Sequence, residues 1–470
     1  MYKIFGCLSL LFLVSCSKVL DQVPEFTIAE DNYWQTAGDA ESAAVGMYPT
    51  IQSLAQQSPL AFDAASDAAT VVNSANYAPF GLHGIPVDNL IVATYWQNNY
   101  TGIGRANDLL DHVPGMRDSL FIPGQKTRIM GEAYFVRAYL YYNLVKAFGG
   151  VPLVTTPYTS FNADFTIGRS SADSTFQLIV SDLHQAERLL PQSWPATVDT
   201  RGRATQGGAQ ALLAKVYLSM KKDDSAAANA QYVMNNSIYS LVTGAAAYSN
   251  MFSTSGKNGT EAIFEIQYVS STQQAHGLYS FYLPTSGVPA GVQPGSYQIA
   301  PTARIQGAFQ TGDIRQKAAV AMSTPVAPAT PVPYVNKYPR LTGGTEPDII
   351  ALRLADIVLV RAEALNNLGQ TQAATDMLNM IRRRAFAQPL TAASAYDFPS
   401  ADDVAKGYDL TLAIENERFK ELAFEGQRFY DLARTGRAQA VLGITADQTL
   451  WPIPLREIQR NPRLAQNHGY

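Results

Sequence analysis

The sequence predicts a mainly α-helical protein, and three observations support that prediction. Apolar residues recur at three- and four-residue spacing in four long stretches, as they do on one face of a helix. Small residues stand where paired helices would cross, at Ala138, Ala214, Ala362 and Ala373. Prolines and aromatic residues gather in the segments between these stretches, which we expect to form long loops with a few short strands.

The first helical stretch begins at about residue 102, breaks at Pro114 and resumes over residues 127–148. Gly149-Gly150 then stops it. Both sides of residues 127–148 are apolar, so we expect this helix to be buried on two faces. Further helices are expected over residues 174–190, 206–220, 224–236, 350–365, 373–384 and 410–434.

Antiparallel helix pairs with short turns are typical of tetratricopeptide-like repeats, which stack to share one core. The pairs in this chain are unevenly spaced and separated by long insertions, so a regular solenoid is excluded. We expect a degenerate scaffold of helix pairs. The scaffold would carry three loop-rich insertions over residues 58–95, 237–300 and 322–347, and the alternation over residues 261–268 predicts a strand.

The N-terminus resembles a bacterial lipoprotein signal. One positive charge at Lys3 precedes a short apolar run over residues 4–14, which is too short to span a bilayer as a helix. Leu13-Val14-Ser15-Cys16 is similar to a lipobox, so we expect cleavage after residue 15 and acylation of Cys16. The alternative is an ordinary secretory signal in which Cys16 is incidental. Cys7 would leave with the signal, and the mature protein would have no disulfide.

Composition argues against nucleic-acid binding. The chain has 35 basic and 39 acidic residues, and no basic stripe of the kind that contacts phosphates. It has 25 Tyr, 20 Phe and 26 Pro, while charged residues make up only 16%. Polar aromatic side chains suggest a surface that recognises a ligand by stacking and hydrogen bonding.

No catalytic motif is found. The five histidines lack zinc-site spacing, and no nucleophile elbow or phosphate-binding loop is present, so we expect no enzyme activity, no metal and no cofactor. Whether a calcium ion supports a loop stays open, because loop carboxylates would suit calcium but lack an EF-hand spacing. A glycosidase would need two carboxylates beside the scissile bond. Asp63 and Asp67 are four residues apart and could share a helix face, but many solvated carboxylate pairs have the same spacing. The charged residues from Glu417 to Arg428 favour a structural ion-pair network. Trp96 could be a sugar platform, but its position in a helical pattern favours core packing.

The loops hold the better binding candidates, because they combine hydrogen-bonding side chains with aromatic rings, as a saccharide site requires. The alternative is that the rings anchor the loops to the scaffold. The candidate residues are Asp67, Asn73, Asn76, Tyr77 and Phe80 in the first loop, and Tyr279, Phe281, Tyr282 and Tyr297 in the second.

Six segments of the chain carry recognisable motifs, at residues 20–24, 96–107, 131–153, 352–366, 417–432 and 451–467. The second includes Trp96, Tyr100, Ile103 and Asn107 at helical spacing, and the last begins with Trp451-Pro452-Ile453-Pro454. Taken in order along the chain, these motifs resemble those of the SusD/RagB family of outer-membrane nutrient-binding lipoproteins from Bacteroidetes-type bacteria.

The resemblance implies a lipid-anchored protein on the outer face of the outer membrane. Such a protein captures an oligosaccharide or polysaccharide and passes it to a SusC-like TonB-dependent transporter. Outward orientation rests on the resemblance, since Ser17-Lys18 replaces the acidic run that often follows the cysteine. The alternatives are a peptide or glycopeptide receptor, and a helical-repeat scaffold with no small ligand. We expect a signal peptide over residues 1–15 and two halves, 16–236 and 237–470, that form one compact unit.

Overall fold

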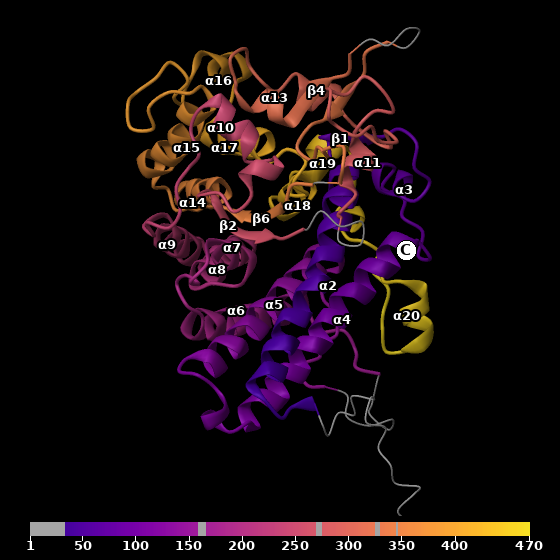
Figure 1. Cartoon of the computed structure of the whole chain (residues 1–470). Coiled ribbons are helices and arrows are strands. Elements are labelled where there is room, and N and C mark those ends of the chain that lie inside the picture. The colour runs from indigo at the N-terminus through magenta and orange to yellow at the C-terminus, as the bar shows by residue number, and fades with distance from the viewer. Residues whose placement is uncertain (1–32, 158–165, 269–274, 325–329, 345) are drawn as a thin grey trace, which may run out of the picture.

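The computed structural model describes residues 33–157, 166–268, 275–324, 330–344 and 346–470 (Figure 1). The predicted signal peptide and Cys16 lie outside the described residues. In the N-terminal half the helices are α2 (Ala37–Ala64), α3 (Ala78–Gly81), α4 (Leu90–His112), α5 (Gln125–Phe148), α6 (Ala172–Leu189), α7 (Thr197–Gly202), α8 (Gln206–Ser219) and α9 (Asp223–Met234).

The C-terminal half continues with shorter helices and several turns. Its helices are α10 (Ala245–Asn250), α11 (Leu278–Tyr282), α12 (Ala303–Gln306), α13 (Arg315–Ala319), α14 (Leu354–Asn367), α15 (Thr371–Ala385), α16 (Ala401–Lys406), α17 (Leu410–Glu421), α18 (Arg428–Arg434), α19 (Ala438–Leu442) and α20 (Leu455–Arg460). The strands are β1 (Ala69–Val71), β2 (Ala262–Ile266), β3 (Ile299–Pro301), β4 (Val320–Met322), β5 (Pro333–Val335) and β6 (Ile349–Arg353).

The predicted fold class is confirmed. Helix α5 packs against α2, α4 and α6, and α8 packs against α6 and α9. Helix α14 then packs against α9, α15 and α17, so successive helices stack side by side as expected for tetratricopeptide-like pairs (Figure 1). One hydrophobic cluster runs from Ala40 to Leu464. The division into two halves at residue 236 stays a prediction.

Helix α2 was not predicted. It is 28 residues long, begins with a capping box between Thr36 and Asp39, and contains Pro49 and Pro59. Prolines inside a helix remove a hydrogen bond and normally end it, so local rules argue against this helix. Burial of its apolar face against α4 and α5 maintains it. The predicted loop over residues 58–95 was therefore wrong at both ends, because it begins in α2 and ends in α4.

Two further boundaries differ from the sequence prediction. Residues 349–353 form β6, which pairs with the predicted strand β2, so the helix expected from about residue 350 begins at Leu354. The helix expected over 410–434 is two helices, because the chain turns through positive φ at Phe424 and Gly426. A side chain at Gly426 would approach the Cα of Pro59 to 3.0 Å, so the turn lets the two halves approach closely.

Trp451 lies at the centre of an aromatic cluster. Its ring is 1% exposed and lies 4.8 Å from that of Phe62 and 5.1 Å from those of Phe80 and Tyr95, measured between centroids. Its backbone N–H donates to the carbonyl of Ala147 at 2.7 Å. The C-terminal motif thus fastens the end of the chain to the N-terminal helices. Trp96 is also buried, as predicted.

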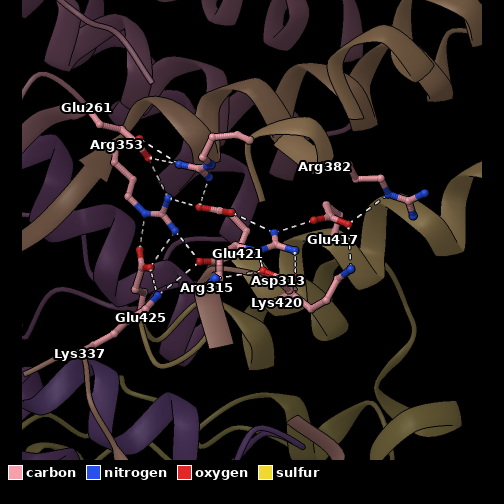
Figure 2. Close-up of polar contacts among 11 residues, drawn as sticks. Glu261, Asp313, Arg315, Lys337, Arg353, Arg382, Glu417, Lys420, Glu421 and Glu425 are labelled. Carbon is pink, nitrogen blue, oxygen red and sulfur yellow. Dashed lines mark hydrogen bonds and ion pairs between the residues drawn. The ribbon is translucent and has the colours of Figure 1, made fainter. Parts of the chain in front are cut away.

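The charged cluster around α17 is a buried ion-pair network, as predicted (Figure 2). Glu421 is fully buried and lies 2.5 Å from Arg353, 2.5 Å from Arg384 and 3.1 Å from Arg315. Figure 2 shows the chain of contacts extending from Glu261 at one end to Arg382 at the other. These arginines hold the pKa of the Glu421 carboxyl well below its usual range, although burial by itself would raise it. Glu261 and Glu421 both have cationic partners, which are Arg353 of β6 and Arg384 of α15. The network therefore holds α15, α17 and β6 together.

Candidate functional site

Strand pairing brings the candidate loops together. β1 pairs antiparallel with β3, so Thr70 lies opposite Ala300. The backbone N–H groups of Val72 and Asn73 both donate to the carbonyl of Gln298, at 2.8 and 3.3 Å. The first and second predicted loops, far apart in the sequence, therefore lie side by side. Figure 1 shows β1, α11 and α3 near one another at the upper right of the molecule.

The third predicted loop reaches the same place. The Tyr297 hydroxyl donates to the carbonyl of Pro333 at 2.7 Å. Val292 and Leu341 form an isolated β-bridge, and the N–H of Gln293 donates to the carbonyl of Arg340 at 2.8 Å. All three loop-rich segments of the sequence thus meet on one side of the helical scaffold.

Three of the candidate aromatic residues are buried. Phe80 and Tyr282 are fully buried and Tyr77 is 4% exposed. The Tyr77 ring meets the ring of Phe281 edge-on at 5.7 Å, and the Tyr282 ring stacks on that of Tyr338 at 5.8 Å. In this structure Tyr77, Phe80 and Tyr282 therefore anchor the loops, which is the alternative role weighed for them. The physical reason is that the loops pack on each other and leave these rings no path to solvent.

Asp63 and Asp67 have separate structural roles. Asp63 is buried, where its two carboxylate oxygens accept from Gly426 N–H at 3.1 Å and from the Tyr282 hydroxyl at 3.3 Å. Burial raises the pKa of Asp63 to about 8. The Asp67 carboxylate accepts from Arg428 at 2.8 and 3.0 Å and pairs with Arg304 at 3.0 Å. The ligand contact expected for Asp67 stays a prediction, and a ligand there would compete with these two arginines for the carboxylate oxygens.

The remaining candidate residues are accessible. Asn73 and Asn76 are exposed, and Tyr279, Phe281 and Tyr297 are partly exposed. We call these five residues the loop surface. They combine amide groups, which can donate and accept hydrogen bonds, with aromatic rings that cover apolar patches of a ligand.

Tyr279 and Tyr297 are held in defined positions. The Arg340 guanidinium lies over the Tyr279 ring, 5.2 Å from its centroid, and Gln293 donates to the Tyr279 hydroxyl at 3.1 Å. Tyr297 has a φ of +50°, an uncommon value for a residue with a side chain, and such positions concentrate at ligand sites. Sequence reasoning missed Gln293 and Arg340 because nothing in their local pattern marks them. Their contacts with Tyr279 come only from the meeting of the loops.

Clefts occur elsewhere on the scaffold. One of about 370 Å³ lies among α9, α14, α17 and α18, and another of about 570 Å³ lies between α4 and α20. Within the described ranges, no three His, Cys, Asp or Glu side chains are grouped so that they could hold a metal ion. The described helices include none with the length and apolar character needed to cross a membrane.

Two family models match the sequence. The first, described as starch-binding and associating with the outer membrane, matches residues 31–218. The second, described as the SusD family, matches residues 329–444. Two SusD-like proteins of Formosa agariphila are similar over almost their whole length. The first is 28% identical, and the alignment covers 98% of this chain and 97% of that protein. The second is 26% identical, and the alignment covers 100% of this chain and 99% of that protein.

Solved structures show the same architecture. A laminarin-binding SusD-like protein superimposes with a TM-score of 0.79 and 26% identity, covering 93% of this chain and 100% of that one. A SusD-like protein from Bacteroides fragilis superimposes with a TM-score of 0.80 and 23% identity, covering 94% of this chain and 99% of that one. The first family model spans the motif at residues 96–107, and the alignment with the second Formosa relative covers the whole chain, including residues 451–454. The chain therefore belongs to the SusD/RagB family.

Proposed function

We propose that this protein is a non-enzymatic receptor that captures an oligosaccharide or polysaccharide on its loop surface. The observation that carries the proposal is the meeting of all three loop-rich segments, which gathers accessible rings and amides on one face. The similarity to a laminarin-binding SusD-like protein over 93% of the chain supports a glycan as the ligand.

Four of the five residues of the loop surface have a defined role in this proposal. The partly exposed rings of Tyr279 and Phe281 offer apolar faces to sugar rings, which carry apolar patches on their C–H faces. Asn73 and Asn76 offer amide donors and acceptors to sugar hydroxyls. Arg340 and Gln293 hold Tyr279 before the ligand arrives, so less side-chain freedom is lost on binding.

The test is affinity gel electrophoresis of the purified protein against a panel of polysaccharides that includes laminarin. Tyr279→Ala and Phe281→Ala are expected to weaken binding to the polysaccharide that retards the wild type by about tenfold each, a loss of about 1.4 kcal/mol. Tyr232→Ala is the matched control, because Tyr232 is 39% exposed on α9, away from the loop surface. Circular dichroism of each variant verifies folding.

The outcomes separate the candidate ligands. Retardation of the wild type that is lost in Tyr279→Ala and kept in Tyr232→Ala supports glycan capture at the loop surface. Retardation that both variants keep would place the site elsewhere. Absence of retardation by every polysaccharide, together with heat release on titration with peptides, would favour the peptide or glycopeptide receptor instead.

We further propose that acylated Cys16 anchors the protein in the outer membrane, facing the exterior, and that it passes its ligand to a SusC-like TonB-dependent transporter. The support is family membership and the lipobox-like residues Leu13-Val14-Ser15-Cys16. Co-purification of the transporter with the tagged full-length protein from outer membranes tests the partnership. Recovery of the tagged protein without any TonB-dependent transporter would contradict it.

A further inference from the structure

Lys146 is a largely buried cation that has no hydrogen-bonding or ion-pair partner among the residues that the structure describes. It lies on α5 and is 9% exposed, and its ammonium group lies 4.9 Å from the centroid of the Tyr142 ring and 5.7 Å from that of Phe62. In the part of the chain that the structure describes, it makes no hydrogen bond and no ion pair. Burial lowers the pKa of Lys146 to about 7, repulsion from Lys215 adds to this effect, and attraction to Asp356 and Asp431 opposes it. The ammonium group has no acceptor among the described residues and is not itself fully enclosed, so a water molecule or an anion in the adjoining space is expected to accept its hydrogen bonds.

Two more polar side chains share this face of α5. Asn143 follows Tyr139 by four residues and Lys146 follows Asn143 by three, which places all three on one side of the helix. Among the described residues, neither the Tyr139 hydroxyl nor the Asn143 amide forms a hydrogen bond. All three side chains line the same cavity of about 50 Å³.

The opposite walls of the cavity come from other elements. They consist of α2 at Ala55, Ser58 and Pro59, β6 at Ile349, Ile350 and Ala351, and Tyr338, Glu425 and Gln427. A water needs about 10–15 Å³ of such space, so the cavity admits a small ion or a few waters. It is far smaller than the roughly 300 Å³ of ordinary organic-ligand pockets, which excludes a sugar ring.

Charge decides which occupant fits. Glu425 is the only carboxylate among the residues that line the described cavity. It is already bound by Arg353 at 2.8 Å through each carboxylate oxygen and by Lys337 at 2.5 Å. Lys215, the cation that raises the local positive potential, is paired with Asp356. The Lys146 ammonium is thus the cation on the cavity wall that has no ion-pair partner among the described residues, and Asp356 and Asp431 attract it only from farther away.

We propose that this cavity is a binding site for a small monovalent anion of the halide type, held by the Lys146 ammonium and by donors from Asn143 and Tyr139. An anion there accepts the hydrogen bonds that these side chains otherwise lack. Its walls come from both halves of the chain, so anion binding would stabilise the contact between α5 and β6. The inference is independent of the proposed glycan capture.

Crystals of the wild-type protein grown in sodium bromide provide the direct test. An anomalous bromide peak beside Lys146 is the expected result. Ordered water at that position and no bromide peak would overturn the proposal. Because this experiment uses the unmodified protein, it remains decisive if a substitution at Lys146 prevents folding.

Thermal unfolding at constant ionic strength provides a second test. Gluconate is too large for the cavity, so sodium gluconate serves as the reference salt. At a chloride concentration about tenfold above the Kd, the wild-type Tm should be about 1–2 °C higher in sodium chloride than in sodium gluconate. Lys146→Met should abolish the difference between the two salts. Lys222→Met is the matched control, because Lys222 is exposed, and it should keep the difference. Equal Tm values in both salts for the wild type would count against the site.

Discussion

Replacing Glu421 by glutamine should strongly destabilise the protein. The carboxylate of Glu421 is fully buried between Arg315, Arg353 and Arg384. Glutamine keeps the shape of the side chain but removes its charge, so three buried guanidinium groups lose part of their compensation. Removing one partner from a buried ion pair typically costs about 3–5 kcal/mol, because the remaining charge stays desolvated.

The size of the effect on Tm follows from the number of residues that unfold. Unfolding entropy near Tm is about 2.1 cal/mol/K per residue, which gives about 0.9 kcal/mol/K for the roughly 420 residues that the structure describes. A loss of about 3–5 kcal/mol then lowers Tm by about 3–6 °C in a chain that unfolds in one transition. The depressed pKa of Glu421 means that its contribution is present at neutral pH and is lost as the pH falls through and below its usual range.

Differential scanning calorimetry at pH 7 measures this difference. Asp402→Asn is the matched control, because Asp402 pairs with Lys406 at 2.9 Å and both side chains are about one-third exposed. An exposed pair contributes about 0–1 kcal/mol, so this variant should shift Tm by about 1 °C or less. If Glu421→Gln lowered Tm no more than Asp402→Asn, the network would not be an important source of stability, and the reasoning from buried charge would be refuted.

Three further predictions follow from other parts of the molecule. Burial and the nearby Asp348 raise the pKa of Glu265 to about 8, so its stabilising effect is present at low pH and lost as the pH rises through 8. The Tm of Glu265→Gln should therefore rise relative to the wild-type Tm as the pH increases from 5 to 9. A Tm difference between the two proteins that stays constant over this pH range in calorimetry would contradict this. Trp451→Ala should reduce the free energy of unfolding in urea by about 3–5 kcal/mol, because it leaves a cavity in the aromatic cluster, whereas a loss below 1 kcal/mol would argue against that role. Cys16→Ser should abolish incorporation of labelled fatty acid, and continued labelling would exclude Cys16 as the lipid attachment site.

Local pattern determined most of the scaffold. The helices expected over residues 127–148, 174–190 and 206–220 match α5, α6 and α8 to within two residues. Their apolar residues repeat at helical spacing, and each has a recognisable start or stop in the sequence. The structural role of Trp96 and the ion pairs around Glu421 were also predictable, because charged residues at helical spacing beside an apolar pattern usually pair.

Only the tertiary structure decided the rest. Helix α2 persists through Pro49 and Pro59 because packing against α4 and α5 outweighs the local cost of each proline. Residues 349–353 form a strand because β2 is beside them, and no local pattern contains that partner. Pairing of β1 with β3 brings the loops together, buries Tyr77 and leaves Tyr279 accessible. Sequence spacing reports which side chains share one helix or strand, whereas burial depends on contacts between distant segments, and those contacts form only when the chain is folded.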